Sequence, residues 1–565
     1  MNAIPRRLPR GYYRDNFLVV LEYVIASYSD ILLDEEIAFY DRFIKFSLPA
    51  QRLYVRLISR KGPLFRADKL QYQEIPDLPG AASELSAAGF LAINPQITVR
   101  ELTGILTKPE LLNRYGDQLA HIKNNPKSEQ VACLESNFGA EPQEVSAFMP
   151  DRLFDVYKPM LMAFVRLYQL LFFGNLRQDL TEFVLLDLGL LRYESYTIDP
   201  KDRLFSDRQS LEMYLLLAAL KEQCVEIQPE KDVSALLAIS EQIPRSAVHP
   251  GLERRRSELL NLVARELERL QRPEKASELY EASTAPPARE RRARILVKLD
   301  RERDALALAQ QIVRQPSNEH ELAFGEQFVS RLGKKLGKTV APAPRFACKT
   351  TELVLPQSGQ KVEQAALNYY AQNGYDAYYV ENSLMRGLFG LAFWDIIFMP
   401  VSGCFFNKYQ RGPLDIYTDD FRRQREKEIN NRLSEISADD EWHEKLLDQY
   451  QAKFGINNYL VNWSALDENL LRRACNLIPR NHLVAIFSRL SFDLRNNRRG
   501  FPDLILFKES QKSYKWVEIK GPGDRLQANQ KRWLMVFEQA NIPYEVVYVS
   551  WRLNILQTVI NLTFY

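Results

Sequence analysis

The spacing of apolar residues divides the chain into a long helical part and a shorter C-terminal part that contains strands. From Arg14 to Phe46, apolar side chains recur every three to four positions, which predicts helices. From Arg52 to about Gly116 the pattern changes to short elements joined by turns, as is typical of a winged-helix or SAP-like module. Residues from about 146 to 228 are rich in Leu, Phe and Tyr and predict a helical connector.

A weak internal repeat follows the connector. Five apolar residues recur 29 positions later in the chain, with small and large side chains in the same order. They are Ala264, Leu267, Leu270, Ala276 and Leu279, followed by Ala293, Leu296, Leu299, Ala305 and Leu308. This pattern predicts paired helices that resemble tetratricopeptide hairpins, which commonly repeat every ~34 residues. The Gly-, Lys- and Pro-rich stretch from Gly333 to Arg345 lacks apolar periodicity and predicts a domain boundary.

We therefore expect a multidomain protein whose N-terminal two-thirds are mainly α-helical and whose C-terminal domain is α/β. The expected parts are an N-terminal helical segment (1–50), a winged-helix or SAP-like module (51–116), a helical connector (117–240), tetratricopeptide-like repeats (241–335) and the α/β domain (349–565). A chain of 565 residues is too long for one hydrophobic core, so several domains are required.

Composition excludes several classes of protein. The formal net charge is only +3, so a nucleic-acid surface has to come from local clusters of Lys and Arg. The five cysteines and five histidines are scattered without metal-binding spacing, which argues against a zinc centre and for a reducing compartment. The most membrane-like stretch, Gly387 to Phe406, contains Asp395 and Pro400, so we expect a buried helix and a turn. No membrane partner is expected.

The C-terminal domain carries a pattern of charged residues inside apolar strands. Gly500–Phe507 and Trp516–Gly521 read as two strands joined by a polar turn, followed by a helix and a third strand. Asp503 and Lys520 lie within this pattern together with Glu518. Alternation along a strand places Glu518 and Lys520 on one face, and the hairpin brings Asp503 beside them. Charge is costly in such strands unless it has a function.

Pro502-Asp503, followed after fourteen residues by Glu518-Ile519-Lys520, is the PD…ExK arrangement of restriction-endonuclease-like nucleases. Two hard carboxylates can hold Mg²⁺ or Mn²⁺, which polarises a phosphate and acidifies a water. Lys520 can position that water and offset phosphate charge, and the carbonyl of Ile519 is a further candidate ligand. Gln530, on the helix that follows, is a candidate supporting residue. The motif predicts a metal-dependent phosphodiesterase acting on DNA; alone, it also fits an exposed, salt-bridged hairpin.

Longer segments resemble a known family. RNNRRGFPDLILF and YKWVEIKGPGDRLQANQKRWL resemble the VRR-NUC nuclease module. ENSLMRGLFGLAFWDIIFMP, QRGPLDIYTDDFRRQR and RLYVRLISRKGPLFRADKLQYQEI resemble the Fanconi-associated nuclease family, so the resemblance extends over nearly the whole chain. It implies a 5′-flap-directed, structure-specific endonuclease with 5′-to-3′ exonuclease action, which binds flaps and nicked or gapped duplex in interstrand-crosslink repair.

The resemblance also implies residue roles. It assigns the metal-binding acids to Glu381, Asp503 and Glu518, together with the Ile519 carbonyl and Lys520. From the residues alone, Glu381 is only an acid opening a helix, and Glu363 remains the alternative for its role. Eukaryotic members carry a ubiquitin-binding zinc finger, and no matching Cys/His cluster occurs here. We therefore expect a bacterial member that works at the nucleoid in the cytoplasm; a eukaryotic one would be nuclear.

Two basic clusters are candidate DNA contacts. Arg495, Arg498 and Arg499 lie just before the motif, and the family reading makes Arg495 the residue that grips a 5′ phosphate. Between Arg52 and Leu70, six cations face one anion, giving a local charge of +5. Arg52, Arg56 and Lys61 belong to this second cluster. The interleaved aromatics suit a phosphate-backbone contact, and a solvated helix face is the equal alternative.

Two other functions remain open at this point. The same nuclease core can support a Holliday-junction resolvase if the protein dimerises. Alternatively, the repeats and the DNA module form a non-catalytic repair scaffold. Asp395 and Asp415 are further acids in apolar settings, and we interpret both as structural.

Overall fold

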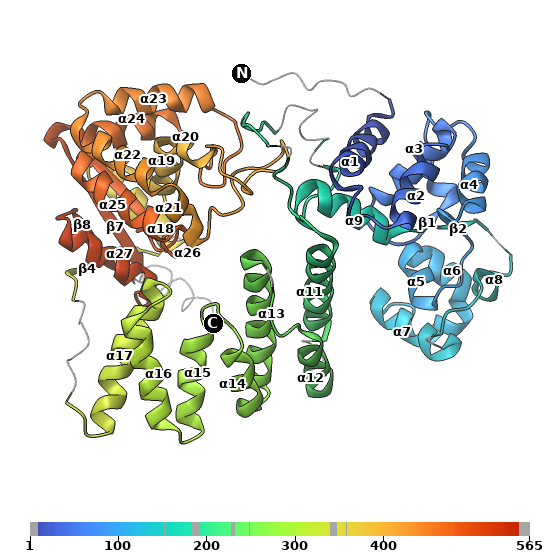
Figure 1. Cartoon of the computed structure of the whole chain (residues 1–565), viewed down its shortest axis with the longest axis horizontal. Coiled ribbons are helices and arrows are strands. Elements are labelled where there is room, and N and C mark those ends of the chain that lie inside the picture. Colours follow the sequence, from blue (N-terminus) through green and yellow to red (C-terminus); the bar gives the residue numbers. More distant parts are fainter. Residues whose placement is uncertain are drawn as a thin grey trace, which may run out of the picture. The chain divides into compact units, whose positions relative to one another are not determined.

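The computed structural model describes residues 10–139, 141–151, 153–181, 183, 191–199, 201–227, 232–247, 249–339, 347–357 and 359–552 (Figure 1). The chain forms two compact units. The first contains the N-terminal 193 residues and two short later segments, and the second contains nearly all the rest. Among the described residues, no helix is long and apolar enough to cross a membrane.

The first unit is helical, with one small sheet. Its helices are α1 (Tyr12–Tyr28), α2 (Asp34–Phe43), α3 (Leu48–Ile58), α4 (Leu78–Ala87), α5 (Val99–Ile105), α6 (Lys108–Leu119), α7 (Lys127–Phe138), α8 (Val145–Phe148) and α9 (Met162–Phe173), with 3-10 turns η1 (Ala67–Lys69) and η2 (Ala120–Ile122). Thr98 and Thr107 begin α5 and α6 as capping boxes with acids three residues later. Stacked Phe39 and Phe90 lie in the core between α2 and the sheet.

The small sheet joins residues that are distant in sequence. Strands β1 (Phe65–Arg66) and β2 (Leu91–Ile93) both pair antiparallel with β3 (Val156–Pro159), in the order β1-β3-β2. The third strand comes from the segment expected to be a helical connector. The sheet therefore needs residues well beyond position 116, where the sequence pattern placed the end of the DNA module.

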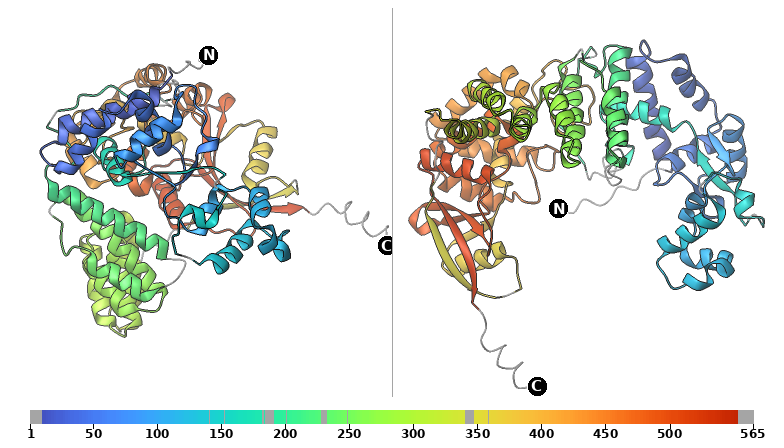
Figure 2. Two further views of the ribbon diagram at one scale, coloured as in Figure 1. Left: turned by 90° about the vertical axis from the view of Figure 1, so that its right-hand side faces the viewer. Right: turned by 90° about the horizontal axis from the view of Figure 1, so that it is seen from below.

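Consecutive antiparallel helices form the repeat region, which begins the second unit. They are α11 (Arg208–Ile227), α12 (Val233–Gln242), α13 (Pro250–Arg269), α14 (Pro273–Glu281), α15 (Ala288–Lys298), α16 (Glu302–Arg314) and α17 (Glu319–Lys335), seen in green to yellow-green in Figures 1 and 2. Each helix from α13 to α17 packs against the next one. The small residues of the repeat, such as Ala264 and Ala293, are fully buried, because a methyl group lets neighbouring helices approach closely.

The C-terminal domain is a mixed five-stranded sheet covered by helices. Its strands are β4 (Thr350–Pro356), β5 (Asp376–Tyr379), β6 (Leu504–Lys508), β7 (Ser513–Lys520) and β8 (Tyr544–Arg552), in the order β4-β8-β7-β6-β5. Strands β5, β6 and β7 are antiparallel neighbours, while β8 runs parallel to both β7 and β4. The three strands predicted from the sequence pattern correspond to β6, β7 and β8.

Helices cover this sheet on both faces. One face packs on α18 (Val362–Gln372). The other packs on a larger core built by α19 (Leu384–Ala392), α20 (Trp394–Ile397), α21 (Asp419–Gln424), α22 (Glu426–Ala438), α23 (Trp442–Lys453), α24 (Glu468–Leu477), α25 (Arg480–Phe492), α26 (Leu494–Asn497) and α27 (Ala528–Gln539). A 3-10 turn, η3 (Glu509–Gln511), joins β6 to β7. The membrane-like stretch forms the buried α19 and α20 and a following turn, as predicted.

Alternation along β7 positions the charged residues. Val517 and Ile519 point into the core beneath α18, whereas Trp516 points into the larger core on the opposite face. Glu518 and Lys520 therefore share the face of Trp516, next to α27.

Candidate active site

Asp503 and Glu518 are brought together by the β6–β7 pairing. Leu504, the first residue of β6, pairs with Val517, so Asp503 lies beside Glu518 at the next position of the ladder. The backbone N–H of Ile519 donates to the Asp503 carboxylate at 2.8 Å. Asp503 itself precedes the strand, because the turn containing Gly500 and Pro502 runs up to β6. The sequence pattern had placed Asp503 inside the strand.

The turn before Asp503 requires glycine at position 500. Gly500 has φ +96°, and a Cβ there would lie 2.9 Å from the backbone of Asn529 at the start of α27. The ring of the following Phe501 packs against Trp533 of α27 at a tilt of 31°, with ring centroids 4.0 Å apart. Close contact between the turn and α27 therefore fixes Asp503 relative to the helix that carries Gln530.

One oxygen of Glu518 is fully engaged and the other is not. Lys520 Nζ lies 2.8 Å from Glu518 Oε1, and the Gln530 side-chain amide donates to the same oxygen at 2.5 Å. Glu518 Oε2 is buried and has no hydrogen-bond partner among the described residues. A buried carboxylate oxygen without a donor is costly unless a cation completes it.

Burial dominates the electrostatics of the pair. Asp503, Glu518 and Lys520 are only 8%, 1% and 7% exposed. Burial raises the pKa of Asp503 to about 6, partly opposed by the Ile519 N–H and by Lys520. Burial and the neighbouring Asp503 carboxylate raise the pKa of Glu518 to about 8, against the effect of Lys520. Burial and mutual repulsion thus disfavour the charged forms of both carboxyls, and a bound cation would stabilise them.

Glu381 reaches this site through the end of β5. The N–H of Val380 donates to the carbonyl of Asp503 at 2.9 Å, which places the next residue, Glu381, beside the pair. The Glu381 carboxylate raises the pKa of both Asp503 and Glu518. Glu381 lies in the turn before α19 and does not open that helix, which begins at Leu384.

Two neighbours hold the Glu381 carboxylate. The Tyr379 hydroxyl donates to Oε2 at 2.6 Å, and the Asn382 amide donates to Oε1 at 3.0 Å. The Asn382 side-chain oxygen also accepts from the N–H groups of Gly500, at 2.7 Å, and Phe501, at 3.3 Å. Asn382 adopts a left-handed φ of +53°, which allows its amide to bridge the two turns. Asn382 was not predicted from the sequence as a site residue.

The site offers two buried carboxylates, with a third close by, and this set of oxygen ligands suits a divalent cation. The unpartnered Glu518 Oε2 and the raised pKa values are what a cation site requires. Among the described residues, no three His, Cys, Asp or Glu side chains already form a converged metal cage. Glu381 therefore has to turn from Tyr379 and Asn382 to contribute an oxygen. Glu363 of α18 also raises the pKa of Asp503, so it remains the alternative third acid.

The three arginines that precede the PD…ExK motif, Arg495, Arg498 and Arg499, have different surroundings. Arg495 is exposed and pairs with Glu258 of α13 at 2.9 Å. It lines a cavity of about 460 Å³ between the repeat helices and the nuclease core, together with Arg254. The carboxylates do not line this cavity. Arg498 lies over the Tyr417 ring at 4.2 Å, and Arg499 is exposed.

Arg386 on α19 lies near Arg498 and Arg499. It was not identified as a candidate residue from the sequence. Burial lowers the pKa of Arg386, and the nearby Arg498 and Arg499 lower it further. Within the described part of the chain, none of these three arginines forms an ion pair with a carboxylate. Other half-buried arginines do, such as Arg432 with Asp395. Arg386, Arg498 and Arg499 thus form a positive cluster without a carboxylate partner among the described residues.

The N-terminal basic cluster is less free than its charge count indicates. Arg56 pairs with Glu74 at 2.7 Å and lies over the Tyr13 ring, and Arg52 donates to the Glu74 carbonyl. Lys61 is exposed. The two structural acids predicted in the nuclease core are both paired: Asp395 with Arg432, and Asp415 with the fully buried Arg425.

Comparisons with known proteins place parts of this chain in two domain families and give its relatives. The VRR-NUC domain family matches residues 438–551, and the FAN1 helix-turn-helix domain family matches residues 11–92. The Fanconi-associated nuclease 1 homolog of Pseudomonas aeruginosa is 35% identical over 546 residues, which cover 96% of each protein. Fanconi-associated nuclease 1 of Mus musculus is 27% identical; the match covers 96% of this chain and 62% of that protein.

Solved structures give the same result. A crystal structure of paFAN1 bound to a two-nucleotide 5′ flap DNA with a gap matches with a TM-score of 0.89 and 35% identity, covering 97% of this chain and 100% of that one. A second, with a one-nucleotide flap, has a TM-score of 0.86. The predicted fold class and the prediction of a PD-(D/E)xK DNA nuclease are confirmed, and this type of domain depends on a divalent metal. The chain therefore belongs to the Fanconi-associated nuclease family.

Proposed function

We propose that this protein hydrolyses phosphodiester bonds in 5′-flap DNA, including flaps of one or two nucleotides, and trims the cut strand in the 5′-to-3′ direction. The main support is the buried Asp503–Glu518 pair, whose free oxygen and raised pKa values call for a cation. Relatives bound to 5′ flaps support the choice of substrate. We infer that the protein acts in the cytoplasm on chromosomal DNA, in repair of lesions that include interstrand crosslinks.

The cation is proposed to be Mg²⁺ or Mn²⁺, because carboxylate and carbonyl oxygens select hard ions. Asp503, Glu518 through its free Oε2, Glu381 and the Ile519 carbonyl would hold it. When bound, such an ion polarises the scissile phosphate and lowers the pKa of a coordinated water. Gln530 keeps Glu518 oriented by its 2.5 Å hydrogen bond.

Lys520 is proposed to act on the attacking water. Its ammonium group lies on the same strand face as Glu518, at 2.8 Å from Oε1, and is held there by burial. From this position it can orient a water toward the phosphate and offset the negative charge that develops during attack. Its removal should therefore lower the rate of cleavage more than the affinity for DNA.

Recognition of the flap is proposed to use Arg495, with Arg498 and Arg499 on the adjoining backbone. Arg495 and Arg254 line the same cavity, so a terminal phosphate there would meet two guanidinium groups. In this structure Arg495 forms an ion pair with Glu258, and a bound phosphate would replace that carboxylate as its partner. In the first unit, Arg52, Arg56 and Lys61 are proposed to hold duplex DNA, with the exposed Lys61 the most available.

The test is cleavage of end-labelled substrates that differ only in structure. A 5′ flap, a 3′ flap and linear duplex of the same sequence are incubated with Mn²⁺, with Mg²⁺ or with EDTA. We expect cutting of the 5′ flap with either ion and none with EDTA. Equal cutting of linear duplex and flap would contradict the structure-specific proposal. Activity that survived chelation would contradict the cation-dependent mechanism.

A further inference from the structure

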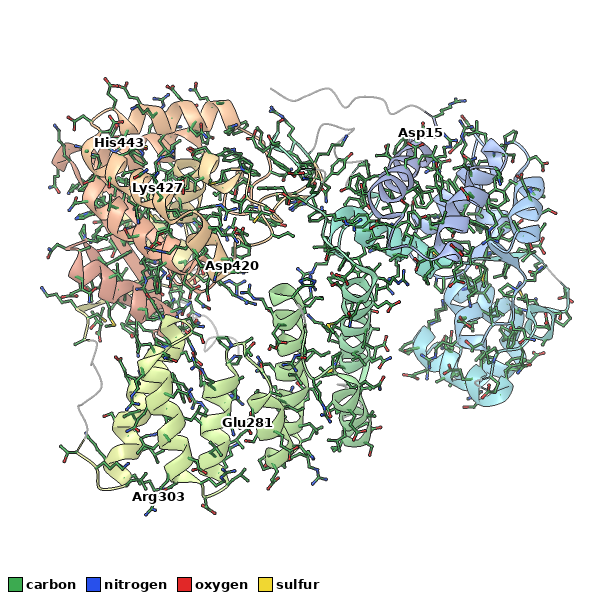
Figure 3. All side chains as sticks on the ribbon, in the orientation of Figure 1. Asp15, Glu281, Arg303, Asp420, Lys427 and His443 are labelled. Atoms are coloured by element: carbon green, nitrogen blue, oxygen red, sulfur yellow. The ribbon has the colours of Figure 1, made fainter. Side chains whose placement is uncertain are left out.

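Phe492 is an exposed aromatic residue at the end of α25, three positions before Arg495. Its side chain is 53% exposed, and the Arg422 guanidinium lies over its ring at 5.8 Å. Arg422 belongs to α21, the short helix that also contains Asp420, which is labelled in Figure 3. An aromatic ring beside an arginine at a hydrophilic surface is the arrangement that holds unpaired nucleobases by stacking.

Phe492 lies where two hollows of the surface meet. It lines the cavity of about 460 Å³ that also contains Arg254 and Arg495, and a second one of about 280 Å³. Arg422 lines the second. The larger cavity falls within the ~300–1,000 Å³ typical of small-molecule sites, so it can accept one nucleotide.

The charges around the ring distinguish base from phosphate. Asp419 and Asp493 line both hollows, and Glu426 lines the smaller one with Phe492. These carboxylates disfavour a phosphate at the ring. The larger cavity also contains Glu253, but that carboxylate pairs with Arg256, so Arg254 and Arg495 are the groups there that can meet a phosphate. A nucleotide therefore fits with its phosphate toward the arginines and its neutral base toward Phe492.

We propose that Phe492, with Arg422, forms a stacking site for the unpaired base at the 5′ end of the flap. This inference rests on the proposed function and adds a base contact to the phosphate contact at Arg495. Stacking tolerates every base, because each has an aromatic face, so the site would select single-stranded ends without selecting sequence. A duplex end keeps its terminal base paired and cannot offer it to the ring.

The first experiment measures binding without cleavage. Full-length protein in EDTA is titrated into a one-nucleotide, 5′-phosphorylated flap carrying 2-aminopurine as the unpaired base. We expect quenching of its fluorescence by wild-type protein and by Phe492→Trp, and little quenching by Phe492→Ala. Phe454→Ala is the matched control, because Phe454 is 52% exposed and lines neither hollow. Equal quenching by Phe492→Ala and wild type would refute the stacking site.

The second experiment measures kcat/KM on two flaps that keep the 5′ phosphate and differ only in whether the terminal nucleotide has a base. Wild type should prefer the flap with the base by about tenfold, within the range that alanine substitution gives for one stacked base. Phe492→Ala should lose this preference, so that its kcat/KM is the same on the two flaps. A wild-type protein that cut both flaps equally would overturn the stacking site alone. One that cut neither would overturn the proposed function.

Discussion

Replacing Asn382 tests how the carboxylates are held in place, because its amide joins two turns that carry different acids. The side-chain nitrogen of Asn382 donates to Glu381. Its side-chain oxygen accepts from the N–H groups of Gly500 and Phe501, which lie three and two residues before Asp503. Asn382→Gly keeps the left-handed backbone without strain but removes all three hydrogen bonds. Asn382→Ala removes the same bonds and adds backbone strain.

The hydrogen bonds of Asn382 determine how much stability and how much activity the two variants should lose. Two backbone N–H groups lose their acceptor, at about 1 kcal/mol each, so the free energy of unfolding should fall by roughly 2 kcal/mol in Asn382→Gly. Alanine at φ +53° costs a further ~1–2 kcal/mol, so Asn382→Ala should be the less stable variant. Partners of metal ligands typically contribute about 10–100-fold to metal affinity or activity. Both variants should lose activity by a factor in that range.

The assay is a Mn²⁺ titration of flap cleavage, with denaturant unfolding measured on the same preparations. Asn382→Gly should need a higher Mn²⁺ concentration for half-maximal rate while remaining folded at the assay temperature. Asn541→Gly is the matched control, because Asn541 has a similar φ of +54° and lies in the turn between α27 and β8. It should retain wild-type Mn²⁺ dependence. An unchanged Mn²⁺ requirement in Asn382→Gly would refute the positioning role.

The charges at and around the site lead to four further predictions. The pKa values of about 6 for Asp503 and 8 for Glu518 mean that a cation displaces protons. Mn²⁺ affinity, measured calorimetrically, should therefore rise between pH 6 and pH 8.5; a flat profile would contradict this. Because both pKa values are raised on folding, the metal-free protein should lose stability as pH rises from the ordinary carboxyl range toward 8. Arg386→Met should weaken flap binding and make its salt dependence shallower, with little loss of melting temperature, because among the described residues the arginine has no carboxylate partner and loses only a 3.3 Å hydrogen bond to the Leu460 carbonyl; a large fall in melting temperature would indicate a structural role. Arg495→Ala should reduce cleavage of 5′-phosphorylated flaps more than unphosphorylated ones, whereas Glu258→Gln should increase that preference; equal effects on both flaps would leave Arg495 a general backbone contact.

The sequence was most informative where function and local periodicity coincide. Glu518 and Lys520 could be placed on one strand face because side chains alternate along β7, and Asp503 followed from the hairpin. The 29-residue spacing likewise reflected small residues at equivalent helix contacts, such as Ala264 and Ala293. In both cases a short stretch of sequence contains all the information that the prediction needs.

Long-range contacts were not accessible in this way. Glu381 joins the site because Val380 bonds to Asp503, more than a hundred residues later, and only the family resemblance suggested it. Asn382 is visible only through bonds to Gly500 and Phe501, although Asn is a residue that tolerates left-handed backbone.

Charge counting has the same weakness. The +5 of the N-terminal cluster omitted Glu74, which pairs with Arg56, and Glu110, which pairs with Arg66. A window of sequence cannot include partners that lie outside it. Conversely, Arg386 gave no signal, because its significance lies in the absence of such a partner among the described residues.

The most direct test of the proposed chemistry is Glu518→Gln in the full-length protein, assayed for 5′-flap binding and Mn²⁺-dependent cleavage side by side. Glutamine preserves the shape of a side chain that is 1% exposed and removes only the charge. We predict flap affinity within about twofold of wild type and cleavage reduced by at least about a hundredfold, as for loss of a preorganised charge in an active site. Cleavage by Glu518→Gln at the wild-type rate would contradict the assignment of this carboxylate to the metal.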